Sequence, residues 1–340
     1  MTTSNRRCSF AFATTSAAAL VALAAACSDP AAPPKSTLLA GDAGDAALAV
    51  DAAIEPDAAP PKPLCDRDAS WDPPTPVQGP AGTLSGDDDE LIGSMTSDEL
   101  SVSWTVAKNA EAYYADRAKP GDPFGAPQKV AGLAVSPLDR VALSHDGRQL
   151  ATIGAGGRSI VVFARAARGD AFALGDAKDF TAITAQASAA PASALLSDLV
   201  FSGDGLALYY SLYAAQAADG GGASTLFVST RTATTDPWPT GKPRSEAELS
   251  QGGDGLRKRP TGISADGLTL FFLDEGAGME RAAHRVTAAA PFSSFVDLGP
   301  RLFATPSADC SRLYYSQLGP APDAGIGSFG SIDLLVANKK

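Results

Sequence analysis

The sequence has few of the residues that build metal and nucleophile sites. Its 340 residues include only 2 His and 4 Cys, too few and too scattered for a zinc site or a His-based catalytic cluster. Basic side chains are also outnumbered, since 27 Lys and Arg stand against 38 Asp and Glu, for a net charge of −11. Because the phosphates of nucleic acids would be repelled by this charge, we expect no nucleic-acid partner.

A nucleotide-binding motif is missing as well. No Gly-rich phosphate loop follows an expected strand and opens a helix, so we expect no cofactor. The composition of 33 Gly, 25 Pro and 7% aromatic residues favours many turns over a helical bundle, and 45% apolar residues are ample for a core. At roughly 150 residues per domain, the length allows two domains or one large one.

The apolar run near the N-terminus is short. Arg6 and Arg7 precede a stretch from Cys8 to Ser28 without any charge, and its centre, residues 17–26, is mostly Ala. A basic start, a short apolar stretch and a small-residue exit predict a secretory signal peptide over residues 1–26. An uncleaved membrane anchor is the weaker alternative, because a spanning helix needs about 20 strongly apolar residues.

Residues 23–27, Leu-Ala-Ala-Ala-Cys, resemble the lipobox of bacterial lipoproteins, in which the Cys becomes the lipidated N-terminus. The resemblance implies that Cys27 carries a lipid and anchors an exported protein at the outer membrane, the cell surface or the periplasm. The sequence departs from the pattern at Ala24, where the family prefers Leu or another branched residue. Ala24 and Ala26 also form an Ala-x-Ala site for an ordinary signal peptidase, so simple secretion is the alternative.

A tether is predicted over residues 27–65. Residues 28–64 are rich in Ala, Pro and Asp and contain no aromatic residue. Such a segment cannot bury enough apolar surface to offset its ordering entropy, and its prolines keep it extended. We therefore predict a disordered linker that holds a domain away from a membrane, with a short helix around residues 46–50 as the alternative.

Beyond residue 65 the sequence repeats itself. A Ser-x-Asp turn recurs five times, and each copy precedes a run rich in aromatic or β-branched residues. The first copy is degenerate, because Thr96 takes the Ser position. Asp-Gly between two such runs is a hairpin signal, since Gly accepts the positive φ of tight hairpins. The five turn residues are Asp98, Asp146, Asp204, Asp266 and Asp309.

An arginine recurs in phase with these turns. Arg117, Arg165, Arg231 and Arg285 each stand seven residues before an aromatic residue. Successive turn Asp residues are 48, 58, 62 and 43 residues apart, which brackets the roughly 40–50 residues of one four-stranded propeller blade. We predict an all-β, five-bladed β-propeller over residues 66–340, with the excess residues in Ala/Gly/Ser loops.

The repeat resembles the WD40-like (PD40), TolB-type β-propeller family, whose core reads Ser-x-Asp-Gly-x-x-Leu-aromatic before a strand that ends near Arg. The resemblance implies that the turn follows the innermost strand of a blade and that the strand after the aromatic is outermost. The last repeat then lacks its outer strand and has Lys339 in place of Arg. Because residues 71–77 look like the outer-strand entry at 124–130, we predict that the N-terminal segment completes this blade and closes the ring.

Two thiols remain for the exported domain once Cys8 leaves with the signal peptide and Cys27 is modified. Cys310 replaces the Gly of the last turn, and Cys65 lies six residues before Trp71, at the expected closing strand. Because export permits disulfides, we predict a Cys65–Cys310 disulfide that fixes the closing strand to its blade. Two unpaired thiols are the alternative.

The repeated Asp residues invite comparison with propeller glycosidases, which cleave with paired carboxylates around the central channel. Because each turn carries one Asp, an Asx-type hydrogen bond explains all of them, and we predict a structural role. We predict no metal site, since the acidic run Asp87–Glu90 lacks the ligand spacing of a known calcium loop. We predict no catalytic residue and no carboxylate on the inner strands, from the segments 93–95, 141–143, 199–201, 261–263 and 304–306.

Arg257, Lys258 and Arg259 form the only dense basic cluster, just before an expected inner strand and near one mouth of the channel. They are candidates to bind an acidic partner or glycan, with ordinary solvated loop charge as the alternative. The sequence favours a monomeric, envelope-anchored propeller that binds or scaffolds an unknown envelope protein or glycan without catalysis. The alternative is a secreted propeller hydrolase or lyase acting on a polysaccharide, which convergent carboxylates in the channel would favour.

Overall fold

The computed structural model describes residues 65–66, 69–80, 82–84, 86, 88–136, 139–190, 194–214, 223–244, 249, 258–318 and 332–340. All of them belong to one unit, Ala58–Lys340. The predicted signal peptide, Cys27, most of the tether and Arg257 lie outside the described residues. Within the described ranges, no helix is long and apolar enough to cross a membrane.

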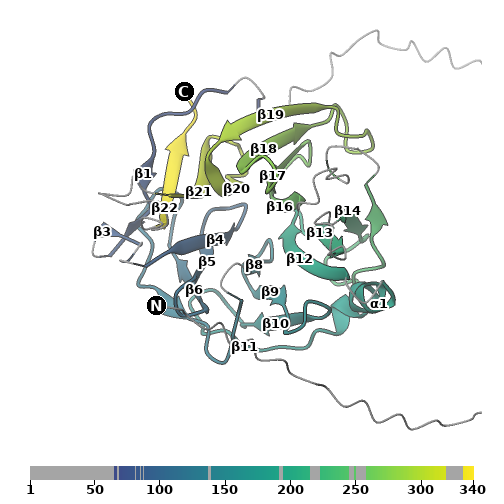
Figure 1. Cartoon of the computed structure of the whole chain (residues 1–340). Helices are drawn as coiled ribbons and strands as arrows, with labels where there is room; N and C mark the ends of the chain where they lie inside the picture. The colour runs from purple at the N-terminus through teal and green to yellow at the C-terminus, as the bar shows by residue number, and fades with distance from the viewer. Residues whose placement is uncertain are drawn as a thin grey trace, which may run out of the picture. The chain divides into compact units, whose positions relative to one another are not determined.

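Five four-stranded antiparallel sheets, the blades, are arranged around a common centre, with the first strand of each blade innermost (Figure 1). Blade A contains β4 (Glu90–Met95), β5 (Ser101–Val106), β6 (Glu111–Asp116) and β7 (Gln128–Lys129). Blade B contains β8 (Ala142–Leu143), β9 (Gln149–Ile153), β10 (Ile160–Ala164) and β11 (Ala173–Leu174). Blade C contains β12 (Ala194–Phe201), β13 (Ala207–Ala214), β14 (Ala223–Thr230) and β15 (Lys242–Pro243). Blade D contains β16 (Lys258–Ile263), β17 (Thr269–Asp274), β18 (Met279–His284) and β19 (Ser294–Gly299). Blade E contains β20 (Arg301–Pro306), β21 (Arg312–Leu318), β22 (Ile332–Asn338) and β1 (Thr75–Pro76), and a small hairpin, β2 (Gln78–Gly79) and β3 (Gly82–Thr83), follows β1. The five-bladed propeller predicted from the sequence is confirmed.

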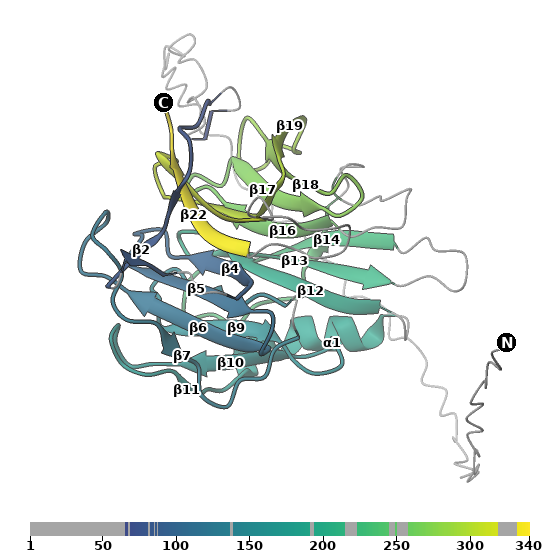
Figure 2. The same cartoon turned by 60° about the vertical axis from the view of Figure 1, so that its left-hand side comes forward.

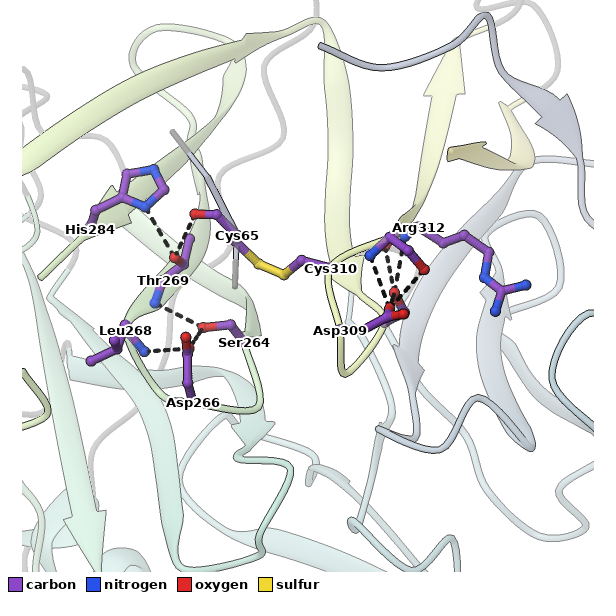
Figure 3. Close-up of a disulfide and its surroundings, with 11 residues drawn as sticks. Cys65, Ser264, Asp266, Leu268, Thr269, His284, Asp309, Cys310 and Arg312 are labelled. Atoms are coloured by element: carbon purple, nitrogen blue, oxygen red, sulfur yellow. Dashed lines mark hydrogen bonds between the residues drawn. A yellow bond between two sulfur atoms is a disulfide. The ribbon is translucent and has the colours of Figure 1, made fainter. Parts of the chain in front are cut away.

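Each inner strand is followed by the Ser-x-Asp turn. In blade D, Ser264 Oγ donates to Asp266 Oδ1 over 2.6 Å, and the Leu268 N–H donates to the same oxygen over 2.9 Å (Figure 3). The Thr269 N–H then donates to Ser264 Oγ over 2.9 Å. The same three bonds recur in the other blades. These side-chain-to-backbone bonds are those that favour Asp at turns.

The repeated arginine joins its own blade's turn to an aromatic ring. The Nε atoms of Arg117, Arg165, Arg231 and Arg285 donate over 2.6, 2.8, 2.9 and 2.8 Å to the carbonyl that ends the turn. Their guanidinium carbons lie 4.3, 4.5, 4.0 and 4.7 Å from the centre of the aromatic ring seven residues later. At these distances the cation is attracted by the ring face. The spacing seen in the sequence therefore reflects a repeated stacked pair.

The N-terminal segment closes the ring as predicted. Strand β1 pairs antiparallel with β22, with Thr75 opposite Val336, and Trp71 forms an isolated bridge with Lys339. Figure 2 shows β22 beside the N-terminal segment that leads into β2. The Lys339 N–H donates to the Ser311 carbonyl over 2.8 Å, as the N–H of the repeated arginine does to the corresponding carbonyl in each other blade.

One insertion differs from the prediction. The excess residues between blades B and C were assigned to loops, but they form a 3₁₀ turn (Lys178–Phe180) and helix α1 (Thr181–Ala189), at the rim of the ring (Figure 1). Ile183 and Ala187 are buried and four residues apart, so they lie on one face of the helix. This face packs with Phe180 and Trp238. Ala has the highest helix propensity, which explains why an Ala-rich insertion forms a helix.

The predicted disulfide between Cys65 and Cys310 is present (Figure 3). The two Cα atoms are 5.1 Å apart, and both residues are buried. Thr269 Oγ1 of blade D donates to the Cys65 carbonyl over 3.4 Å. Cys310 has a φ of 52° in the turn position that glycine holds in blades B, C and D. The bridge therefore fixes the N-terminal segment to blade E and places it against blade D.

Replacing either cysteine is expected to destabilise the whole propeller. The bridge spans 245 residues, and the chain-entropy model assigns about 5 kcal/mol to a loop of that length. Cys310→Gly removes the bridge but suits the positive φ, so we expect it to lose about 1 kcal/mol less than Cys65→Ser. Urea unfolding of the oxidised proteins measures both losses, and reduced wild-type protein serves as the control. A Cys310→Gly protein as stable as the oxidised wild type would contradict the prediction.

Candidate functional site: the central channel

The inner strands are irregular at the same level around the channel. Strands β4, β12, β16 and β20 each shift register against the next strand. The residues skipped at these irregularities are Gly93, Asp198, Thr261, Phe303 and Ala304. Two of them have a positive φ, 46° for Asp198 and 60° for Phe303. A bulge leaves backbone groups unpaired and redirects a side chain. Four blades therefore direct backbone groups or side chains toward the centre of the ring.

Arg140 of blade B donates hydrogen bonds to backbone carbonyls at two of these bulges. Its Nε donates to the Ile92 carbonyl over 2.9 Å, and one terminal nitrogen also donates to the Gly93 carbonyl. On blade D, it donates to the Pro260 and Thr261 carbonyls over 3.1 and 3.0 Å. Burial lowers the pKa of Arg140 to about 10, so the side chain stays charged at neutral pH. One buried cation thus joins blades A, B and D.

Phe303 lies between this arginine and a second one. The guanidinium carbons of Arg140 and Arg259 are both 4.9 Å from the centre of the Phe303 ring. Arg259 donates to Asp198 through Nε over 2.5 Å and through a terminal nitrogen over 3.0 Å. Burial alone would lower the pKa of Arg259, but the charge and hydrogen bonds of Asp198 raise it above its usual value. We call Arg140, Asp198, Arg259 and Phe303 the central plug.

Glu280 of β18 lies behind the plug and is fully buried. It accepts a hydrogen bond from Thr261 Oγ1 and one from the Phe303 N–H over 2.9 Å. Burial raises the pKa of Glu280 to about 8, although these bonds and Arg140 lower it. Glu280 is therefore mostly protonated at pH 7.

On the side of the Ser-x-Asp turns, the channel opens into a hollow that we call the turn-side mouth. It encloses about 470 Å³ of space between atoms, open solvent included. Thr261 and Thr305, next to the plug, line it together with the middle residues of the five turns, Ser97, His145, Gly203, Ala265 and Ala308. No carboxylate is among the described residues that line it. Most of the lining residues have hydroxyl or apolar side chains. The hydroxyl groups can form hydrogen bonds with a neutral polar group.

The structure corrects one prediction about the inner strands. We expected no carboxylate there, but Asp198 lies on β12 and Glu90 begins β4. The prediction was wrong because these strands begin before the three-residue segments that precede the turns. Arg140, Phe303 and Glu280 were not identified from the sequence, since none belongs to the repeat.

The other candidate residues lie as follows. Lys258 and Arg259 are buried on β16, where Lys258 pairs with Asp274 and Arg259 with Asp198. Glu90 lies at the start of β4, where burial and the charge of Asp333 raise its pKa to about 7. In the described part of the chain, no group of His, Cys, Asp and Glu is arranged to hold a metal ion.

No protein-family model matches this chain, and no curated protein matches it. Among solved structures, an α-L-arabinofuranosidase from Podospora anserina in complex with cellotriose is 9% identical, with a TM-score of 0.52 over 82% of this chain and 99% of that chain. Regucalcin from Agrobacterium tumefaciens, described as a calcium-binding protein, is 14% identical, with a TM-score of 0.38 over 72% of this chain and 74% of its own. TolB from Acinetobacter baumannii is 13% identical, with a TM-score of 0.34 over 73% of this chain and 53% of its own. At these identities only the fold is shared, and only the first likeness is close enough to support it.

Glu280→Gln is expected to reduce the pH dependence of stability. The pKa of Glu280 is raised from 4.5 to about 8 on folding, so the folded state keeps a proton that the unfolded state releases. The stabilisation from this proton is complete below pH 4.5 and is lost as pH rises to about 8, by at most about 1.4 kcal/mol per pH unit. Gln does not titrate, so its unfolding free energy should fall less over this range.

Urea unfolding of both proteins across the same pH range measures this difference. Glu90 is unchanged in both proteins and therefore contributes equally to the two curves. Parallel curves for wild type and Glu280→Gln would contradict the assignment of a raised pKa to Glu280.

Proposed function

We propose that this protein is an envelope-anchored propeller that binds a protein or glycan partner without catalysis. The observation that carries the proposal is the central plug. Glycoside cleavage uses a pair of carboxyl groups that flank the scissile bond. Here Asp198 is held in two hydrogen bonds by Arg259, and Glu280 is buried behind Phe303. Neither carboxyl group lines the turn-side mouth.

The turn-side mouth is the surface we assign to the partner. Its rim consists of one variable residue from each turn. Because Ser and Asp of the turns are held by their own hydrogen bonds, the residue between them can vary without loss of the turn. The five blades thus present five adjustable positions around one hollow.

Anchoring through Cys27 is supported by the lipobox resemblance of residues 23–27. The chain from Cys27 to Cys65 spans 38 residues, which reaches up to about 120 Å if extended as a Pro-rich linker. Since Cys65 is bonded to blade E, a lipid at Cys27 would hold the propeller from the side where its ring closes.

Cys27→Ala is expected to abolish lipidation. Metabolic labelling with a palmitate analogue should tag the wild-type protein and not the variant, because the modified thiol is lost. Cys65→Ser is the matched control and should be labelled like the wild type. Equal labelling of wild type and Cys27→Ala would exclude the lipid anchor and favour simple secretion.

Ala308→Trp is expected to block the turn-side mouth. Ala308 is partly exposed in the last turn and lines this hollow, so a large ring there should reduce partner capture at least tenfold. Ala131→Trp, at an exposed position outside the hollow, is the control. Glycan arrays and crosslinking in intact envelopes, with the same three proteins, measure the capture.

Equal capture by Ala308→Trp and wild type would contradict binding at this mouth. The alternative function is that of a hydrolase or lyase that cleaves a polysaccharide, and the fold shared with the arabinofuranosidase is the observation that favours it. Release of sugars from a polysaccharide by the wild type, lost in Asp198→Asn, would support that alternative and overturn a non-catalytic role.

A further inference from the structure

The contact between blades A and B shows how the repeated arginine is neutralised. Arg165 of blade B donates to both oxygens of Asp116 over 2.5 and 2.8 Å, and to Ser101 Oγ over 3.2 Å. Asp116 ends β6, directly opposite Ser101 on β5. Planar, two-point pairing of this kind is the preferred geometry between Arg and a carboxylate. Blade A therefore supplies a carboxylate to the arginine of blade B.

The contact between blades C and D has the same arginine without that carboxylate. Arg285 takes the place of Arg165, donates to the Gly267 carbonyl over 2.8 Å and is 7% exposed. Thr230 stands in the position of Asp116, opposite Ala207 in the position of Ser101. Both polar partners of the A–B contact are thus replaced. Within the described residues, the remaining bond of Arg285 to blade C goes to the Tyr209 hydroxyl over 3.3 Å.

A hollow lies where the missing carboxylate would be, and we call it the C–D pocket. It encloses about 790 Å³ of space between atoms, open solvent included, and Thr230, Tyr209 and Arg285 line it. A Cβ atom added at Gly147 would come within 2.9 Å of Ser101 Oγ, whereas one at Gly267 would meet only Arg285, at 3.5 Å. The space is therefore filled between blades A and B and open between blades C and D.

Arg285 is the cation of the C–D pocket that would face an anion, since the position of Asp116 is held here by Thr230. Arg231, Arg244 and Arg285 line the pocket, against the two turn residues Asp204 and Asp266. Each of these Asp residues accepts hydrogen bonds from the Ser and the backbone of its own turn. The guanidinium carbons of Arg244 and Arg285 lie 5.4 and 4.7 Å from the centre of the same ring, Phe292.

The apolar part of the lining limits the kind of anion. Leu206, Val228 and Ile263 form apolar walls beside the arginines. A pocket with apolar walls and a few polar groups is typical of sites for small organic ligands. A bare inorganic anion would leave these walls in contact with water, whereas an organic acid would cover them.

We propose that the C–D pocket binds a small organic carboxylate of about the size of a sugar acid. Its carboxylate would pair with Arg285 as Asp116 pairs with Arg165, and its remaining atoms would lie against Leu206, Val228 and Ile263. Ala308, the residue substituted to block the turn-side mouth, does not line the C–D pocket. The two proposals are therefore tested at different positions. Failure of one proposal therefore leaves the other open to its own test.

The experiment compares two probes that differ in one carboxylate. Isothermal titration of the purified mature protein with D-glucuronate and D-glucose should give at least tenfold tighter binding of glucuronate. Inorganic phosphate is the third probe and should bind at least tenfold more weakly than glucuronate. Equal affinity for glucuronate and glucose, or phosphate binding as tight as that of glucuronate, would overturn the proposal.

Two variants at one exposed position locate the site. Thr230→Asp supplies the missing carboxylate from the protein itself, so it should raise the melting temperature and weaken glucuronate binding at least tenfold. Thr230→Asn introduces a side chain of nearly the same shape as Asp but without its charge. It should therefore keep the wild-type affinity for glucuronate within about threefold. Unchanged binding by Thr230→Asp, or an equal loss in both variants, would overturn the assignment to Arg285. The comparison of glucuronate with glucose stands on the wild-type protein, whatever the stability of the variants.

Discussion

The arrangement of the blades depends on one repeated interaction, the stacking of an arginine between a turn and an aromatic ring. Each of Arg117, Arg165, Arg231 and Arg285 caps the carbonyl of its own turn and covers the ring seven residues later. Three of them also bond to the preceding blade, at Tyr314, Asp116 or Tyr209. Because a buried guanidinium must have its donors satisfied, this residue fixes the turn, the outer segment and the neighbouring blade together.

The ring closure uses the two turns that lack glycine. Glu99 and Cys310 have positive φ angles of 58° and 52°, which are costly for residues with a side chain. Each makes a contact that glycine cannot make. Glu99 accepts hydrogen bonds from Arg312 and from the Tyr314 hydroxyl over 3.0 and 2.6 Å, which joins blade A to blade E. Cys310 forms the disulfide with Cys65. The cost of a positive φ at these two turns is therefore offset by bonds that join blade E to blade A and to the N-terminal segment.

The plug fills the centre of the ring, and the two hollows described above lie at the turn-side mouth and at the seam between blades C and D. Arg140 and Arg259 occupy the middle of the ring, and their hydrogen bonds use the carbonyls and the carboxylate that the bulged inner strands expose. The A–B and C–D seams differ in the residue before the repeated arginine, which is Asp116 in blade A and Thr230 in blade C. The residue opposite it also differs, Ser101 in blade A and Ala207 in blade C, so two side chains separate the neutralised contact from the open pocket.

The sequence by itself determined the number of blades, their strand order, the closing segment and the Cys65–Cys310 pair. The blade number and strand order follow from patterns within one repeat, since a turn, a strand and a stacking arginine interact with residues close in the chain. The closing segment and the disulfide join the two ends of the domain, and they were predicted because the last repeat lacks its outer strand. Only the tertiary structure decided the plug, because Arg140, Asp198 and Phe303 lie far apart in the sequence and meet only when the ring closes. The positive φ of Asp198 and Phe303 has no local signal, for neither is a glycine. The open C–D pocket likewise emerged only when the register placed Thr230 where another blade has Asp116, opposite an arginine 55 residues further along the chain.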